Sequence, residues 1–119
     1  MKASLVDFSN DAVVYNITGT TRQELENKLN LFFVSEKLHL KSEKTDEKIY
    51  QRGNKVWRVL LGVFVKYFKL VVTIKQQDEL FSIRLYRDMN LIMSGGLIGI
   101  KKSRAEFNRI NEAFKVYFN

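Results

Sequence analysis

The chain has 119 residues, a formal net charge of +7, one histidine and no cysteine. This length supports a single domain, residues 1–119, with its own core. The missing cysteines exclude disulfides, thiolate metal sites and cysteine nucleophiles, and one histidine excludes a multi-histidine metal site. The first fifteen residues contain no apolar signal-peptide run, so we expect a cytoplasmic protein. The longest apolar run, Val59 to Val65, has seven residues, whereas a membrane-spanning helix needs about 20.

Positive charge is concentrated in the second part of the chain. Residues 1–50 contain seven basic and eight acidic side chains, whereas residues 51–119 contain thirteen and five. No acidic residue lies between Glu47 and Asp78, and that interval includes the most apolar stretch, Val56 to Ile74. Its basic residues are Lys48, Arg52, Lys55, Arg58, Lys66, Lys69 and Lys75. A segment that is both apolar and basic needs a surface to pack against and attracts anions.

The first predicted elements are a strand and a helix. Residues from Ala12 to Thr18 alternate in the period of a strand, which ends at Gly19. Thr21 and Glu24 then have the spacing of a capping box, which predicts the start of a helix. Its apolar stripe comprises Leu25, Leu29, Phe32, Phe33 and Leu38.

Two polar strands and one ambiguous segment follow. Residues 38–44 and 48–52 have few apolar side chains, so we expect two strands near a sheet edge, joined through Thr45 and Asp46. The spacing of apolar residues in Val56 to Phe64 favours a short helix after Gly53, whereas its β-branched content favours a buried strand. We expect the helix.

A β-hairpin is predicted next, from Lys69–Lys75 and Leu80–Arg87 with a turn at Gln76 to Glu79. One face is apolar, with Leu70, Val72 and Ile74 matching Phe81, Ile83 and Leu85. Strand periodicity places Lys69, Val71, Thr73 and Lys75 on the opposite face, beside Ser82, Arg84 and Tyr86.

The chain is expected to end with a glycine-rich connection and a helix. Gly95, Gly96 and Gly99 predict a loop or a glycine-bent strand over residues 89–100. Ser103 and Glu106 have capping-box spacing and predict the helix start. The apolar stripe of this helix comprises Phe107, Ile110, Phe114, Tyr117 and Phe118.

This order of strand, helix, three or four strands and helix predicts an α+β fold, in which two main helices pack on one face of an antiparallel sheet. In element order the chain resembles the TATA-binding-protein-like and helix-grip layouts. The resemblance implies an architecture and no activity.

No segment has the spacing of a reaction centre, so we expect no catalytic residue, metal or cofactor. The run from Gly95 to Ser103 resembles a phosphate loop in its glycines and lysines, but it lacks the Gly-Lys-Ser succession, and an ordinary turn is expected. The carboxylates lie in turns, caps and polar stretches, where they are solvated. His39 is expected at an exposed strand edge, without further metal ligands.

The apolar segment supplies the leading functional hypothesis, a non-enzymatic binding protein. Its large side chains can form core, a small-molecule pocket or a subunit interface, and we expect self-association through Val56 to Phe68. A protein partner or an apolar small molecule is the expected ligand. The predicted interface or pocket residues are Trp57, Leu60, Leu61, Phe64, Tyr67 and Phe68.

The alternative is a nucleic-acid-binding protein that uses a basic sheet face. Cations beside an aromatic ring can hold phosphates and stack a base. The candidate contacts to nucleic acid or another anion are Lys69, Lys75, Arg84, Tyr86, Lys101 and Lys102.

Overall fold

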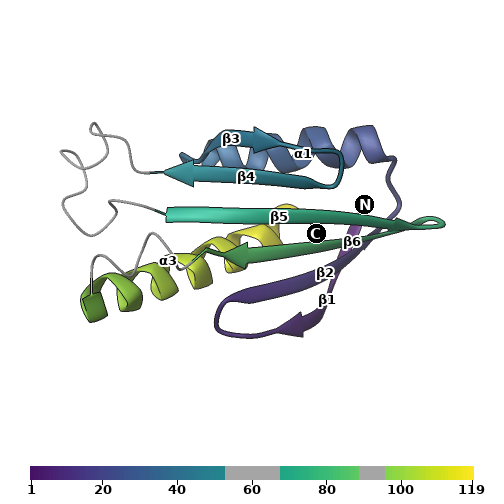
Figure 1. Ribbon diagram of the computed structural model, residues 1–119. Coiled ribbons are helices and arrows are strands. Elements are labelled where there is room, and N and C mark those ends of the chain that lie inside the picture. Colours follow the sequence, from purple (N-terminus) through teal and green to yellow (C-terminus); the bar gives the residue numbers. More distant parts are fainter. Residues whose placement is uncertain (53–67, 89–95) are drawn as a thin grey trace.

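The computed structural model describes residues 1–52, 68–88 and 96–119, with the side chains of 96–103 excepted. The described strands form one six-stranded antiparallel sheet in the order β1-β2-β6-β5-β4-β3 (Figure 1). The strands are β1 (Lys2–Phe8), β2 (Ala12–Thr18), β3 (His39–Glu43), β4 (Glu47–Arg52), β5 (Phe68–Gln77) and β6 (Leu80–Arg87). Two helices are described, α1 (Arg22–Ser35) and α3 (Gly96–Tyr117).

Aromatic contacts place both helices on the same face of the sheet. Tyr15 of β2 stacks on Phe114 of α3, with 4.7 Å between ring centroids, and Tyr50 of β4 lies 4.6 Å from Phe33 of α1. The two helices meet where Phe32 packs edge-on against Phe114 at 5.4 Å. The predicted α+β fold, an antiparallel sheet with two helices, is confirmed; the closer resemblance to TATA-binding-protein-like or helix-grip layouts stays a prediction.

Helix α1 begins where its capping-box spacing predicts, but it ends at Ser35, so Leu38 of the predicted apolar stripe lies outside the helix. The Thr21 hydroxyl accepts a hydrogen bond from the backbone N–H of Glu24 at 3.2 Å, which satisfies one free donor of the first turn. At the other end Lys37 adopts a left-handed conformation with φ of 65°, and Leu38 donates its N–H to the Phe33 carbonyl at 2.9 Å. This reversal returns Leu38 to the core, where it is buried.

Strand β1 is an element that the sequence pattern did not predict. Only Ala3 in this edge strand is buried, so no alternation of buried and exposed side chains marks it. The pairing with β2 also shifts between Leu5 and Asp7, which breaks the two-residue period. Pairing with β2, rather than side-chain burial, therefore defines β1.

The start of α3 was predicted wrongly. The helix begins at Gly96, so residues 96–100 are helical instead of forming a glycine loop or strand, and Ser103 lies within the helix instead of at its cap. Each glycine costs a helix interior about 1 kcal/mol relative to alanine. Two glycines near the helix start weaken the local preference without preventing a helix of 22 residues. The predicted apolar stripe is buried except at Tyr117, which is exposed.

The β5–β6 hairpin has the predicted register. Val71 pairs with Tyr86, Thr73 with Arg84 and Lys75 with Ser82, so the apolar set faces the helices. The strands extend to Gln77 and resume at Leu80, and Asp78 takes a left-handed conformation with φ of 56° at the turn. The two polar strands, β3 and β4, also form as predicted, with β3 at the sheet edge; residues 56–64 lie outside the described residues.

One polar side chain lies in the core without a hydrogen-bond partner among the described residues. Asn111 of α3 is 3% exposed, and neither its Oδ1 nor its Nδ2 atom has a partner. Its backbone carbonyl accepts a long hydrogen bond, 3.5 Å, from the Tyr15 hydroxyl. Burial of an amide without a partner costs about 1–3 kcal/mol.

We therefore predict that Asn111→Leu raises the free energy of unfolding by about 1–2 kcal/mol, because leucine has a similar size and no polar atom to desolvate. Urea denaturation measures the change. Asn108→Leu, at an exposed position of the same helix, is the matched control for helix propensity. An equal gain in both variants, or a loss in Asn111→Leu, would show that the amide is satisfied in solution.

Candidate binding surface on the open sheet face

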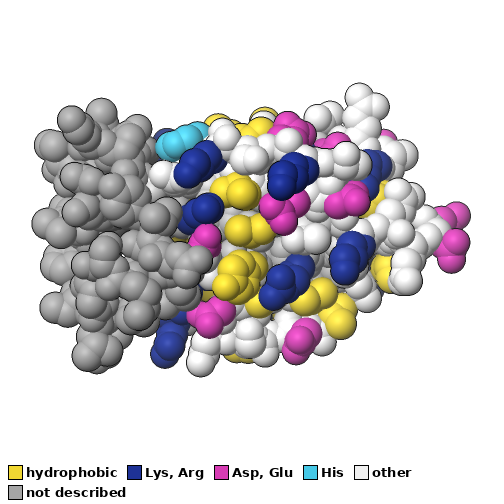
Figure 2. Space-filling view, viewed as in Figure 1, with side chains coloured by type: hydrophobic (Ala, Val, Ile, Leu, Met, Phe, Trp, Pro, Cys, Tyr) yellow, Lys and Arg dark blue, Asp and Glu magenta, His cyan; other side chains and the backbone are white. Residues whose placement is uncertain are grey.

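The face of the sheet opposite the helices carries an apolar row that crosses four strands. Ala12 of β2 is the cross-strand neighbour of Tyr86, Tyr86 of Val71, and Val71 of Ile49 in β4. We call these four residues the apolar row. All of them are half-buried, and the column of hydrophobic side chains that crosses the strands is visible in Figure 2.

Charged residues lie on both sides of the apolar row. Arg84 of β6, Thr73 of β5 and Glu47 of β4 are cross-strand neighbours on one side. On the other side, Lys69 of β5 lies beside Asp88, and the Lys69 Nζ atom is 3.3 Å from an Asp88 carboxylate oxygen. The apolar row is therefore bordered along each edge by both basic and acidic side chains.

The predicted basic contacts share this face in part. Lys69, Lys75, Arg84 and Tyr86 lie on it, as strand periodicity predicted. Two of the three cations already have partners, since Lys69 pairs with Asp88 and the Arg84 guanidinium lies 5.1 Å from the centre of the Tyr86 ring. Lys101 and Lys102 lie in α3, but their side chains are outside the described residues.

Sequence reasoning missed the acidic residues of this face. Glu47 and Asp7 lie on it because they pair with Thr73 and Val14, whose side chains point away from the helices. With Asp88, three carboxylates lie on the face that carries Lys69, Lys75 and Arg84. Alternation in β4, where Lys48 and Tyr50 are buried, could have placed Glu47 here. Asp7 gave no such signal because β1 has no regular alternation.

The predicted apolar interface is described at one residue only. Phe68 begins β5, is 2% exposed and lies on the helix side of the sheet, with the Arg52 guanidinium 5.9 Å from its ring centre. Its side chain belongs to the core. Trp57, Leu60, Leu61, Phe64 and Tyr67 lie outside the described residues.

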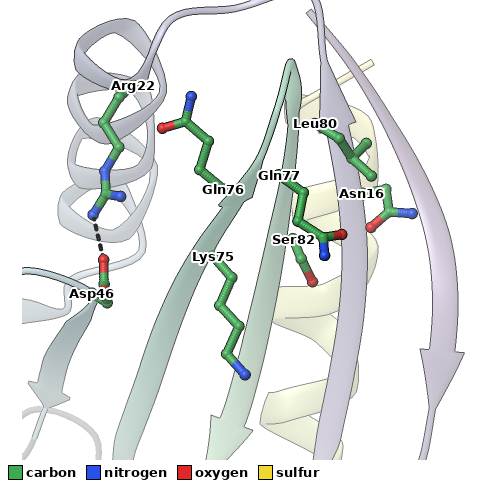
Figure 3. A pocket seen from close by; sticks show the side chains of 8 residues that line it. All are labelled: Asn16, Arg22, Asp46, Lys75, Gln76, Gln77, Leu80 and Ser82. Atoms are coloured by element: carbon green, nitrogen blue, oxygen red, sulfur yellow. Dashed lines mark hydrogen bonds and ion pairs between the residues drawn. The ribbon is translucent and has the colours of Figure 1, made fainter.

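An open depression of about 630 Å³ lies near the tip of the β5–β6 hairpin (Figure 3). Lys75, Gln77, Ser82 and Asn16 line one part of it, and Arg22 of α1 lies on its other side. The carboxylate at the rim, Asp46, is 3.2 Å from the Arg22 guanidinium. The described side chains that line the depression are mainly polar, and Asp46 is the one carboxylate among them, so they include no pair of carboxylates that could act as acid and base.

A second charged cluster joins α1, β4 and α3 on the helix side. Glu106 lies 3.2 Å from Arg52, which is 5% exposed, and also pairs with Arg109; Arg109 in turn lies 2.7 Å from Glu36 at the end of α1. Burial disfavours the charged carboxylate, but hydrogen bonds and charge from Arg109 and Arg52 hold the pKa of Glu106 below its usual value. The cluster is best explained as a structural link between three elements.

Two core tyrosines are also perturbed. Burial raises the pKa of Tyr15 and that of Tyr50 to about 12, and nearby glutamates add to the effect. Among the described residues, no group of three histidine, cysteine, aspartate or glutamate side chains could hold a metal ion. His39 is exposed in the edge strand β3, as predicted. In the described part of the chain no helix is long and apolar enough to span a bilayer.

Comparison with known proteins adds no assignment: no protein-family model matches this chain, and no relative is found among curated proteins.

The Glu106 cluster generates a prediction about pH. Because the folded-state pKa of Glu106 is lowered, its contribution to stability is complete above the ordinary value of 4.5 and is lost as the pH falls through the folded-state pKa. Glu106→Gln should cost about 1–3 kcal/mol at pH 7, because the buried Arg52 then loses its ion pair with Glu106. The difference from the parent protein should shrink as the pH falls below 4.5.

Urea denaturation over pH 3–7 tests this, with Glu79→Gln in the exposed hairpin turn as the matched control. The control should change stability by less than about 0.5 kcal/mol at every pH. A cost for Glu106→Gln that is independent of pH would contradict the assignment.

Proposed function

We propose that this chain is a non-enzymatic binding protein that binds another protein surface through the open face of its sheet. The observation that carries the proposal is the apolar row, whose four side chains cross β2, β6, β5 and β4 without a covering element among the described residues. An apolar centre with a charged border is the usual anatomy of a protein interface. Tyrosine and arginine, both enriched at interfaces, occur here as Tyr86 and Arg84.

The arrangement of charge favours a protein over nucleic acid. A phosphate backbone requires uncompensated cations, because binding depends on neutralising phosphates. On this face Asp88 pairs with Lys69, and Glu47 lies one strand beyond Thr73, the neighbour of Arg84. Carboxylates at these positions would repel a nucleic acid that follows the basic side chains, whereas a protein surface can offer both signs of charge.

The shape of this face favours a protein over a small apolar ligand. Small-molecule sites are concave and enclose most of the ligand. The apolar row instead lies along a sheet surface, and the depression at the hairpin tip has mainly polar side chains around it. An apolar molecule on this face would leave much of its surface in water.

Photo-crosslinking in cells tests the proposal. A photoreactive amino acid at position 71 should give a discrete protein adduct, because Val71 lies at the centre of the apolar row. The matched control is the same residue at position 116, since Val116 of α3 is 80% exposed on the helix layer and would react more if exposure alone mattered. Adding Ile49→Lys should remove the adduct at position 71 while the circular dichroism spectrum stays unchanged.

Three results would contradict the proposal: equal adducts at both positions, no adduct at position 71, or an adduct that nuclease removes. The third result would favour the nucleic-acid alternative. In that case, affinity for a single-stranded oligonucleotide should fall steeply with salt. It should also fall when Lys69, Lys75 and Arg84 are all changed to glutamine.

A further inference from the structure

We infer that the protein surface bound by the open sheet face is the same face of a second copy of this chain. This inference rests on the proposed function and adds the identity and orientation of the partner. In the arrangement we propose, the two sheets pack back to back, with a two-fold axis that runs parallel to the strands between β5 and β6. Aligned packing of this kind brings sheets to about 10 Å apart.

Side-chain size in the apolar row fits this symmetry. The row runs Ala12, Tyr86, Val71, Ile49 across β2, β6, β5 and β4. A two-fold axis between its two middle members places Tyr86 over Val71 of the second copy. The same axis places Ile49 over Ala12 of the second copy. Each large side chain therefore meets a smaller one, which is how facing layers interdigitate without voids.

Charge also fits the same symmetry. Lys69 and Asp88 lie side by side on β5 and at the end of β6, 3.3 Å apart between charged atoms. The two-fold axis places Lys69 over Asp88 of the second copy and Asp88 over Lys69 of the second copy, so that four charges alternate in sign. On the other side of the row, Glu47 of the second copy lies over Val14, between Arg84 and Asp7, so attraction and repulsion offset each other there. A pair of opposite charges related in this way is complementary to itself, so the Lys69–Asp88 pair carries the charge argument.

The sheet edges are poorer sites for a second copy. At edge strand β1, the backbone N–H of Ala3 already donates to the Asn119 side chain at 3.3 Å, and that of Phe8 donates to the Asp7 side chain at 2.9 Å. An irregularity between Leu5 and Asp7 further interrupts the edge. Capped donors, a bulge and a charge are devices that prevent strand addition. The other edge, β3, has five residues and includes Lys41.

Paired charge reversals test both the partner and its orientation. Lys69→Asp leaves two acidic side chains at positions 69 and 88, and Asp88→Lys leaves two basic side chains there. In the proposed arrangement each variant faces its own charge across the axis, so each alone should lose self-association by at least about tenfold. An equimolar mixture of the two variants should restore association, because the acidic pair of one variant then faces the basic pair of the other. Sedimentation velocity measures the species relative to the 14.0 kDa monomer.

Lys115→Asp is the matched control, because Lys115 pairs with Glu112 at 3.2 Å on α3 and the change reverses the same charge on the helix layer. This variant should associate like the parent protein. If either charge variant does not fold, Val71→Lys replaces it as the test of the interface and should give a monomer. Folding is verified by circular dichroism before each measurement.

Separate results decide between the inference and the function on which it rests. The parent protein could stay monomeric at high micromolar concentration while position 71 crosslinks to a different polypeptide. This result would overturn the inference that the partner is a second copy, and it would leave the proposed function standing. A dimer that resists Val71→Lys overturns the interface. A dimer that Val71→Lys breaks, but that the mixed charge variants do not restore, overturns the orientation. No discrete adduct at position 71 overturns both proposals.

Discussion

Burial of one side of the sheet determines which side chains of each strand form the core and which do not. Both described helices pack against the same face, where Tyr15 stacks on Phe114 and Tyr50 contacts Phe33. Strand periodicity then divides every strand into side chains that face the helices and side chains that do not. The second set has no helix over it among the described residues, so core packing does not constrain which side chains it contains. An apolar row on that face, which includes Val71, is consequently a feature that the core does not require.

Charge has two separate roles in this chain, and the net value of +7 does not distinguish them. Several cations of the basic half serve the fold: Arg52 pairs with Glu106, Arg87 with Asp11 at 2.5 Å, and Arg109 with Glu36. Arg87 is fully buried, so its charge contributes little to the surface. Net charge describes long-range attraction of anions, whereas a binding surface depends on which charges lie together. On the open sheet face the described charges are mixed.

Elements with one buried face could be predicted from apolar spacing, whereas the edge strand β1 gave no such signal. The stripe of α1 and the hairpin register follow from apolar spacing, because Leu25, Leu29 and the alternating residues of β5 are buried as that spacing requires. Strand β1 has a single buried residue, Ala3, and its order comes from pairing with β2. The start of α3 was missed because glycine was read as a helix breaker, although it only lowers helix stability. Local spacing also identified the basic side of the open face but not its acidic members, which come from β1, β4 and the end of β6.

The position of the apolar row on the sheet limits what can use it. Its middle members, Tyr86 and Val71, lie on the two central strands, which are fixed by pairing on both sides. A surface on central strands is rigid, so a partner that fits it loses little entropy to ordering of the site. Rigidity also makes the match of size and charge decisive, since the surface cannot repack around a poor fit. A row of unequal side chains bordered by opposite charges would therefore select a partner of complementary size and charge, and a second copy offers that complement in the arrangement that we propose.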